Sequence, residues 1–90
     1  MEVKKIMVSG SSPVKETAGS IVKCYLESGI HDIELRAIGA SAVNQAVKAL
    51  ATSRSIFAQK GLDLLVKPGY DEVVIEGSKR TVMVFRIDVN

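Results

Sequence analysis

The chain contains 90 residues, of which 47% are hydrophobic and 4% are aromatic, and its formal net charge is +2. This composition excludes a disordered chain and predicts one small domain over residues 1–90, with a core of aliphatic side chains. The weak positive charge is compatible with nucleic-acid binding, although a dedicated nucleic-acid binder usually carries a stronger basic excess.

The sequence shows no signal for export or membrane insertion. Glu2, Lys4 and Lys5 interrupt the first seven residues, so these do not form the apolar region of a signal peptide. No apolar stretch approaches the roughly 20 residues that a membrane helix needs. The single cysteine, Cys24, excludes an internal disulfide and a multi-cysteine metal site. We therefore expect a cytoplasmic protein without a membrane partner.

Strands and helices alternate in the first half of the chain. Apolar residues alternate with polar ones in the two strand segments, and they recur at helical spacing in the segments that follow. Ser12 before Pro13 predicts a helix N-cap followed by a first-turn proline, and Gly29 is a suitable residue to end that helix. The predicted elements are a strand over residues 2–8, a helix over 13–28, a strand over 32–38 and a helix over 41–58.

The second half predicts two further strands joined by a hairpin turn. An extended segment begins at residues 62–67, is kinked by Pro68-Gly69 and resumes over residues 70–76. A turn at residues 76–79 leads into the clearest strand, residues 80–89. The order is β-α-β-α-β-β, in which the first two strands are expected to be parallel. Two helices cover only one face of such a sheet, so the other face must meet solvent or another subunit.

The most distinctive run of the sequence is RAIGASAVNQAVKA, residues 36–49. It closely resembles the stage V sporulation protein S family, which is remotely similar to the archaeal chromatin protein Alba. The resemblance follows nearly the whole chain in order and includes Ser11-Ser12-Pro13, residues 61–65, Glu76-Gly77 and Arg80-Thr81. It implies an α/β fold of two layers (α+β), with a mixed four-stranded sheet and both helices on one face. Strand one would lie beside strand two, and strand four between strands two and three.

The same resemblance implies binding of DNA or RNA. In Alba proteins, the loop after the first strand, the start of the second helix and the tip of the last hairpin approach nucleic acid; here these regions are residues 9–13, 36–41 and 77–80. Alba proteins carry lysines in the first loop and an arginine after the glycine before the second helix, whereas this chain has serines and Ala40 there. The candidate binding residues are Lys5, Ser11, Ser12, Lys15, Arg36, Gly39, Ser41, Asn44, Lys79 and Arg80.

Each of these regions also has a purely structural interpretation. Helix N-termini suit a phosphate, but Ser12 can simply cap a helix and Gly39 can simply form a turn. The cations of residues 79–80 would either neutralise phosphates or protect a solvated strand edge. Arg36 would either position a phosphate or pair with a carboxylate such as Glu34.

Self-association as a dimer or tetramer is a separate expectation. Alba-like proteins carry a phenylalanine near the end of the second helix that serves contacts between subunits, and Phe57 stands near this point. An aromatic residue there is also compatible with a core position. The candidate interface residues are Phe57, Leu50 and Arg54.

No motif indicates catalysis, since G-x-S-x-G, H-E-x-x-H and the P-loop are all missing from the sequence. His31 is expected in a surface turn and Cys24 within a helix, so we expect no enzyme activity, cofactor or metal. We expect a nucleic-acid-binding protein with low sequence selectivity, because the chain offers backbone contacts and few aromatics for base stacking. The family resemblance implies a role in development or sporulation. The alternative is a protein-interaction or regulatory module that does not bind nucleic acid.

Overall fold

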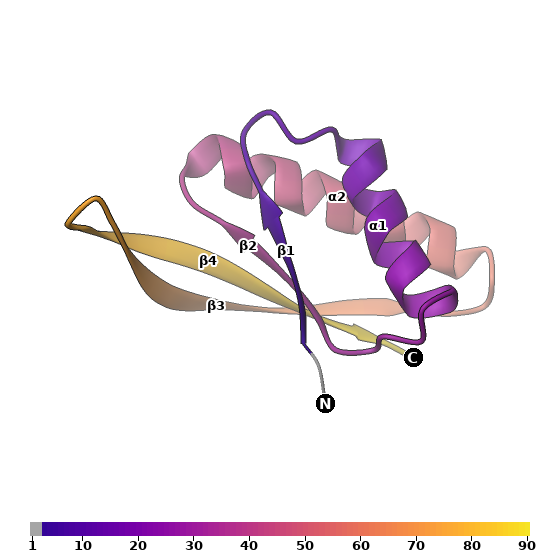
Figure 1. Ribbon diagram of the computed structural model, residues 1–90. Helices are drawn as coiled ribbons and strands as arrows, with labels where there is room; N and C mark the ends of the chain where they lie inside the picture. Colours follow the sequence, from indigo (N-terminus) through magenta and orange to yellow (C-terminus); the bar gives the residue numbers. More distant parts are fainter. Residues whose placement is uncertain (1–2) are drawn as a thin grey trace.

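A computed structural model of the chain, which describes residues 3–90, shows two helices packed on a four-stranded sheet (Figure 1). The sheet order is β1-β2-β4-β3, with β1 and β2 parallel and β4 antiparallel to both of its neighbours. The predicted order of elements and the implied strand neighbours are confirmed; Glu2, the first residue of the predicted first strand, lies outside the described residues. The elements are β1 (Lys4–Val8), α1 (Val14–Leu26), β2 (Ile33–Ala37), α2 (Ala40–Ala58), β3 (Leu64–Ile75) and β4 (Ser78–Val89).

Both helices cover the same face of the sheet (Figure 1). Side chains along each strand alternate between the two faces, so every second residue of a strand points towards the helices. Ile33, Leu35 and Ala37 of β2 are buried in the core with Phe85 and Ile87 of β4. Ile33 and Leu35 lie directly opposite these two β4 residues, so their side chains share one face. The opposite face carries no helix, as predicted, and we call it the open face.

Helix α1 begins one residue later than the sequence predicts. Pro13 has an extended backbone, with φ −66° and ψ 130°, and occupies the N-cap position rather than the first turn. Ser12 is therefore one residue too far from the helix, and its hydroxyl accepts a hydrogen bond from the Ser9 N–H at 2.8 Å. The prediction that Ser12 caps α1 is wrong, because Ser12 stabilises the preceding loop instead.

The two C-terminal strands form one long hairpin that projects from the body of the molecule (Figure 1). The predicted kink at Pro68-Gly69 is wrong, because the pairing of β3 with β4 continues without a break from Leu64 to Ile75. A proline is tolerated here because β3 is an edge strand, whose outer side needs no N–H donor. The strands are joined by the two residues Glu76 and Gly77, with φ angles of 51° and 78°, as in a type I′ turn.

Candidate nucleic-acid interface

The outer part of this hairpin, residues 70–83, is the most prominent feature of the molecular surface, and we call it the ribbon. At its base Met83 still pairs with Ala37 of β2, but from Val82 outward β4 pairs with β3 alone. The ribbon gives the molecule its length, with principal extents of 44 × 28 × 19 Å. At its base Val82 is buried and Asp71 pairs with Arg36 of β2, but its outer residues lie beyond β2 and can reach a large partner.

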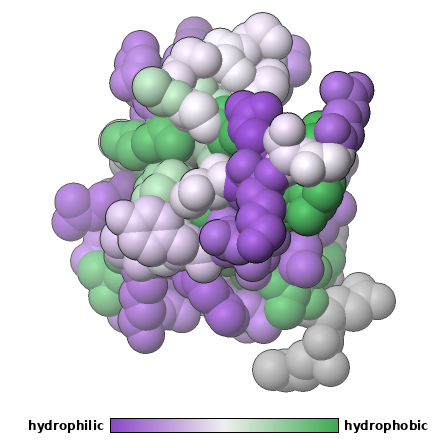
Figure 2. Space-filling view, turned by 90° about the vertical axis from the view of Figure 1, so that its left-hand side faces the viewer, coloured by the Kyte–Doolittle hydropathy of each residue, from purple (hydrophilic) through white to green (hydrophobic). Residues whose placement is uncertain are grey.

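Lys79 and Arg80 lie on β4 next to the turn, and both are exposed. They point to opposite faces of the ribbon, because Lys79 is opposite Val74 and Arg80 is opposite Val73. Neither forms an ion pair with any residue in the range 3–90. Figure 2 looks onto the end of the molecule where the ribbon projects. In this view hydrophilic side chains run down the middle of the surface, and hydrophobic side chains lie on both sides of them.

The open face carries basic residues of a different kind: Arg36, Arg86 and Lys67 are each paired with a carboxylate. Lys5 is also exposed on this face and forms no ion pair with any of residues 3–90. The side chain of Arg36 is only 11% exposed, and its pKa is raised by hydrogen bonds first to Asp71 and then to Glu34. The same pairing holds the pKa of Asp71 below its ordinary value, helped by a hydrogen bond from the Glu72 N–H. The ion pairs are Arg36–Glu34 at 3.0 Å, Arg36–Asp71 at 2.6 Å, Arg86–Asp32 at 2.8 Å and Lys67–Asp88 at 3.6 Å.

Two predicted binding residues belong to the open face. Arg36 was expected to position a phosphate, but two carboxylates occupy its guanidinium, so the structural interpretation with Glu34 is correct. Lys5 was expected near the first loop, yet it lies opposite Glu34 on the open face, towards the other end of β1. Strand alternation therefore places both side chains on the open face.

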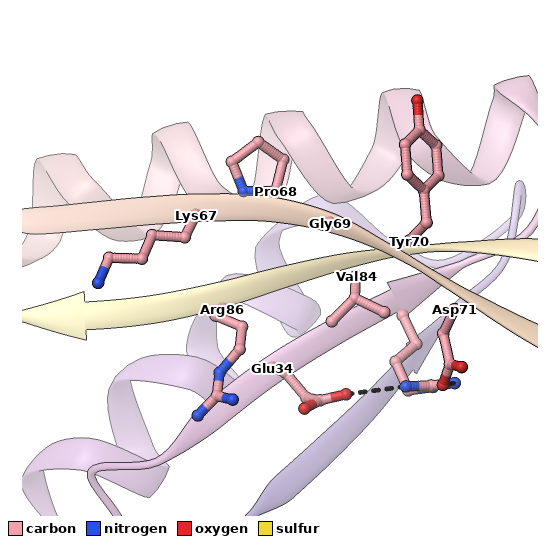
Figure 3. Close-up of a pocket in the computed structure, with 9 residues that line it drawn as sticks. Glu34, Lys67, Pro68, Gly69, Tyr70, Asp71, Val84 and Arg86 are labelled. Carbon is pink, nitrogen blue, oxygen red and sulfur yellow. Dashed lines mark hydrogen bonds and ion pairs between the residues drawn. The ribbon is translucent and has the colours of Figure 1, made fainter.

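A shallow hollow of about 340 Å³ lies on the open face (Figure 3). It forms where Gly69 has no side chain, opposite Val84, and its walls include Arg36, Asp71 and Arg86. These charged walls are already neutralised by the ion pairs just described, and no histidine or cysteine lines the hollow.

The first loop and the start of α2 meet at the carboxyl ends of β1 and β2. The Gln45 side-chain amide donates to the Ser12 carbonyl at 2.8 Å, and a Cβ on Gly10 would collide with the Ser41 hydroxyl. Gly10 is thus packed closely against the first turn of α2. The Ser9 hydroxyl is hydrogen-bonded to the Ser11 hydroxyl and to the Ser12 hydroxyl, at 3.2 Å in each case.

The structure brings several predicted binding residues together near this end of the sheet. Gly39 adopts φ +89°, a conformation that favours glycine, directly before α2. Ser41 and Asn44 are exposed in the first turns of α2, and Lys15 is exposed in the first turn of α1. These residues form a polar surface around two helix N-termini, separate from the ribbon.

The predicted interface residues are mostly internal. Phe57 is fully buried and Leu50 is 6% exposed, and both belong to the core of the single chain. The expectation that they contact another subunit is wrong, because their side chains are packed within the core, where the Phe57 ring contacts Tyr25. Arg54 is exposed and pairs with Asp63 at 3.0 Å.

His31 and Cys24 do not form a catalytic arrangement. His31 is exposed and its ring stacks on Tyr25 at a centroid distance of 4.4 Å, whereas Cys24 is half-buried in α1. Within the described part of the chain, no group of three or more metal-binding side chains comes together. Nor does any helix in residues 3–90 have the length and apolar character to cross a membrane.

Sequence reasoning missed Tyr70, whose side chain is 81% exposed on β3. Alternation places Tyr70 opposite Met83, on the helix-covered side of the sheet, where an aromatic ring would be expected in the core. Only the position of Tyr70 on the edge strand, beyond the cover of the helices, leaves it exposed. No pattern in the sequence by itself indicates this.

Two comparisons with known proteins agree with the geometry. The structure is similar to that of Alba from Thermoplasma volcanium, with a TM-score of 0.63 and 17% sequence identity over 97% of this chain and 99% of that chain. This likeness shows that the fold is Alba-like. The family model for stage V sporulation protein S matches residues 4–90. The chain therefore belongs to the stage V sporulation protein S family.

Proposed function

We propose that this protein is a non-enzymatic nucleic-acid-binding protein that contacts the phosphate backbone with its ribbon. The observation that carries the proposal is the state of the ribbon cations. Of the four arginines, three are paired with carboxylates, whereas Arg80 has no such partner among residues 3–90, and neither has its neighbour Lys79. Both stand on a projecting element next to its turn.

An unpaired cation at such a tip keeps its full charge for an anionic partner. Neutralising a phosphate there releases counterions and costs no internal ion pair. Phosphate contacts of this type position a protein without reading sequence, so we expect low sequence selectivity. The polar surface around Lys15 and Ser41 would add a second contact, because helix N-termini attract phosphate.

The test is a titration of the protein with duplex DNA and with RNA at about 50 and 200 mM salt. Two phosphate contacts predict that affinity falls about tenfold between these concentrations, and additional contacts steepen the fall. Absence of binding at the lower salt concentration, or an affinity indifferent to salt, contradicts the proposal.

A protein-interaction module is the second candidate, and exposed apolar groups on the open face favour it. Met7 is 62% and Leu65 49% exposed there, next to the hollow and its balanced ion pairs. This function predicts that a specific protein partner is retained after nuclease treatment. Retention of nucleic acid without such a partner favours the first function.

Self-association as a dimer or tetramer stays a prediction. After the correction for Phe57 and Leu50, it rests on the open face, where no helix covers the sheet, and on the long hairpin with its apolar residues. Light scattering at micromolar concentration measures the mass directly. A monomeric mass would remove the prediction without affecting the role of the ribbon cations.

A further inference from the structure

Tyr70 is the aromatic residue that the fold leaves uncovered. The chain has two phenylalanines, two tyrosines and no tryptophan. Phe57 and Phe85 are buried, and the Tyr25 ring is stacked on His31 and contacts Phe57. Tyr70 has the largest exposed fraction, 81%, among the large hydrophobic side chains of residues 3–90. Its ring is thus available to a flat partner.

The orientation of Tyr70 separates it from the open face. Tyr70 is among the residues that line the hollow. Figure 3 nevertheless shows its ring pointing to one side of the sheet, whereas Val84 and Asp71 point to the other side. No ion-paired group of the open face therefore covers the ring. The hydroxyl makes no hydrogen bond to any residue in the range 3–90, so nothing in that range fixes the ring against the protein.

Lys79 shares this side of the ribbon with Tyr70. The register pairs Tyr70 with Met83, Glu72 with Thr81 and Val74 with Lys79, and every second pair faces the same way. Four residues along a strand correspond to about 13 Å at roughly 3.3 Å per residue. This separation matches a few stacked nucleotides of one strand, at about 3.4 Å each.

We propose that the Tyr70 ring is a stacking platform for an unpaired base, with Lys79 contacting the backbone of the same strand. The preferred ligand is then single-stranded nucleic acid. In a duplex both faces of a base are already stacked, so the ring can reach a base face only where the base is unpaired. Exposed aromatic rings beside cations are the usual means of binding single strands. This inference rests on the proposed function and names the form of nucleic acid that the ribbon selects.

Glu72 faces the same side, between Tyr70 and Lys79 in the register. Its carboxylate repels a backbone that passes from one to the other. We therefore expect Glu72→Gln to strengthen single-strand binding about twofold, whereas Arg80, on the opposite side of the ribbon, lies outside this path.

Tyrosine fluorescence measures the stacking directly. In Tyr25→Phe, Tyr70 is the sole tyrosine, and titration with a short oligo(dT) should quench its emission with the same midpoint as binding. The matched control is Tyr70→Phe, in which the remaining Tyr25 is shielded by His31 and Phe57 and should keep its emission. Quenching equal in both variants, or absent in Tyr25→Phe when oligo(dT) is bound, overturns the proposal.

Affinities supply the second measurement. Tyr70→Ala should weaken oligo(dT) binding about tenfold and duplex binding less than about twofold, while Tyr70→Phe retains wild-type affinity for both. Unchanged oligo(dT) binding in Tyr70→Ala, with salt-dependent binding of duplex by the wild type, overturns the stacking role and leaves the proposed function standing. A wild type that binds neither nucleic acid at low salt overturns both.

Discussion

Basic side chains occur in two contrasting settings on the same sheet. On the open face Lys67, Arg86 and Arg36 each lie within 3.6 Å of a carboxylate. On the ribbon Lys79 and Arg80 have no carboxylate partner within residues 3–90. These three cations of the open face are therefore neutralised internally, although Lys5 on the same face is not, whereas both ribbon cations keep their positive charge for another molecule.

The surroundings of the two sets of cations differ. On the open face Arg86 lies opposite Glu34, and Arg36 reaches from β2 across β4 to Asp71 of β3. On the ribbon the residues opposite the two cations are Val74 and Val73. The net charge of +2 does not reveal which cations are paired and which are free.

The largest effect on stability is expected for Arg36→Leu. The Glu34 side chain, only 9% exposed, loses the partner that compensates for its burial. We expect the free energy of unfolding in urea to fall by about 2 kcal/mol, less than for a fully buried pair because Asp71 remains hydrated. Affinity of the folded variant for nucleic acid should not change.

The control for this variant is Arg36→Leu combined with Glu34→Leu, which removes both charges and should restore most of the lost stability. A large loss of nucleic-acid affinity in folded Arg36→Leu would contradict the claim that the paired cations of the open face do not take part in binding.

A comparison of two double variants tests the ribbon at constant net charge. Lys79→Ala with Arg80→Ala should weaken binding about tenfold and lower the salt slope by about two. Lys67→Ala with Arg86→Ala removes the same charge from the open face and should weaken binding less than about twofold, because those cations are already paired. Equal losses in the two double variants would show that only overall charge matters.

The smallest effect on stability is expected for Asp71→Asn, which removes from the open face a carboxylate whose pKa is lowered. A carboxyl whose pKa is lower in the folded protein stabilises it above the ordinary value of 3.8, and this contribution is lost as pH falls through the lowered pKa. The variant should therefore melt slightly below the wild type at neutral pH. The difference should shrink as the pH falls below 3.8 and the carboxyl takes up its proton. A difference that is constant with pH would assign the effect to packing.

Much of the fold could be predicted because it follows from local patterns. Alternation and helical spacing locate all six elements to within a few residues, and Glu76-Gly77 marks the hairpin turn. The start of α1 and the continuity of β3 at Pro68 were missed, since each depends on one residue's backbone or on the strand's place at the sheet edge. The site was less predictable: Lys79 and Arg80 lie where expected, but Arg36 and Lys5 face elsewhere.

By itself the sequence determined the order of elements and the family, because periodicity and a distinctive run of residues are properties of the chain alone. Only the tertiary structure decided that Phe57 lies in the core, that Arg36 is paired and that Tyr70 is exposed. Burial and ion pairing depend on which distant segments come together. Two residues of the same type, such as Tyr25 and Tyr70, can therefore have opposite surroundings.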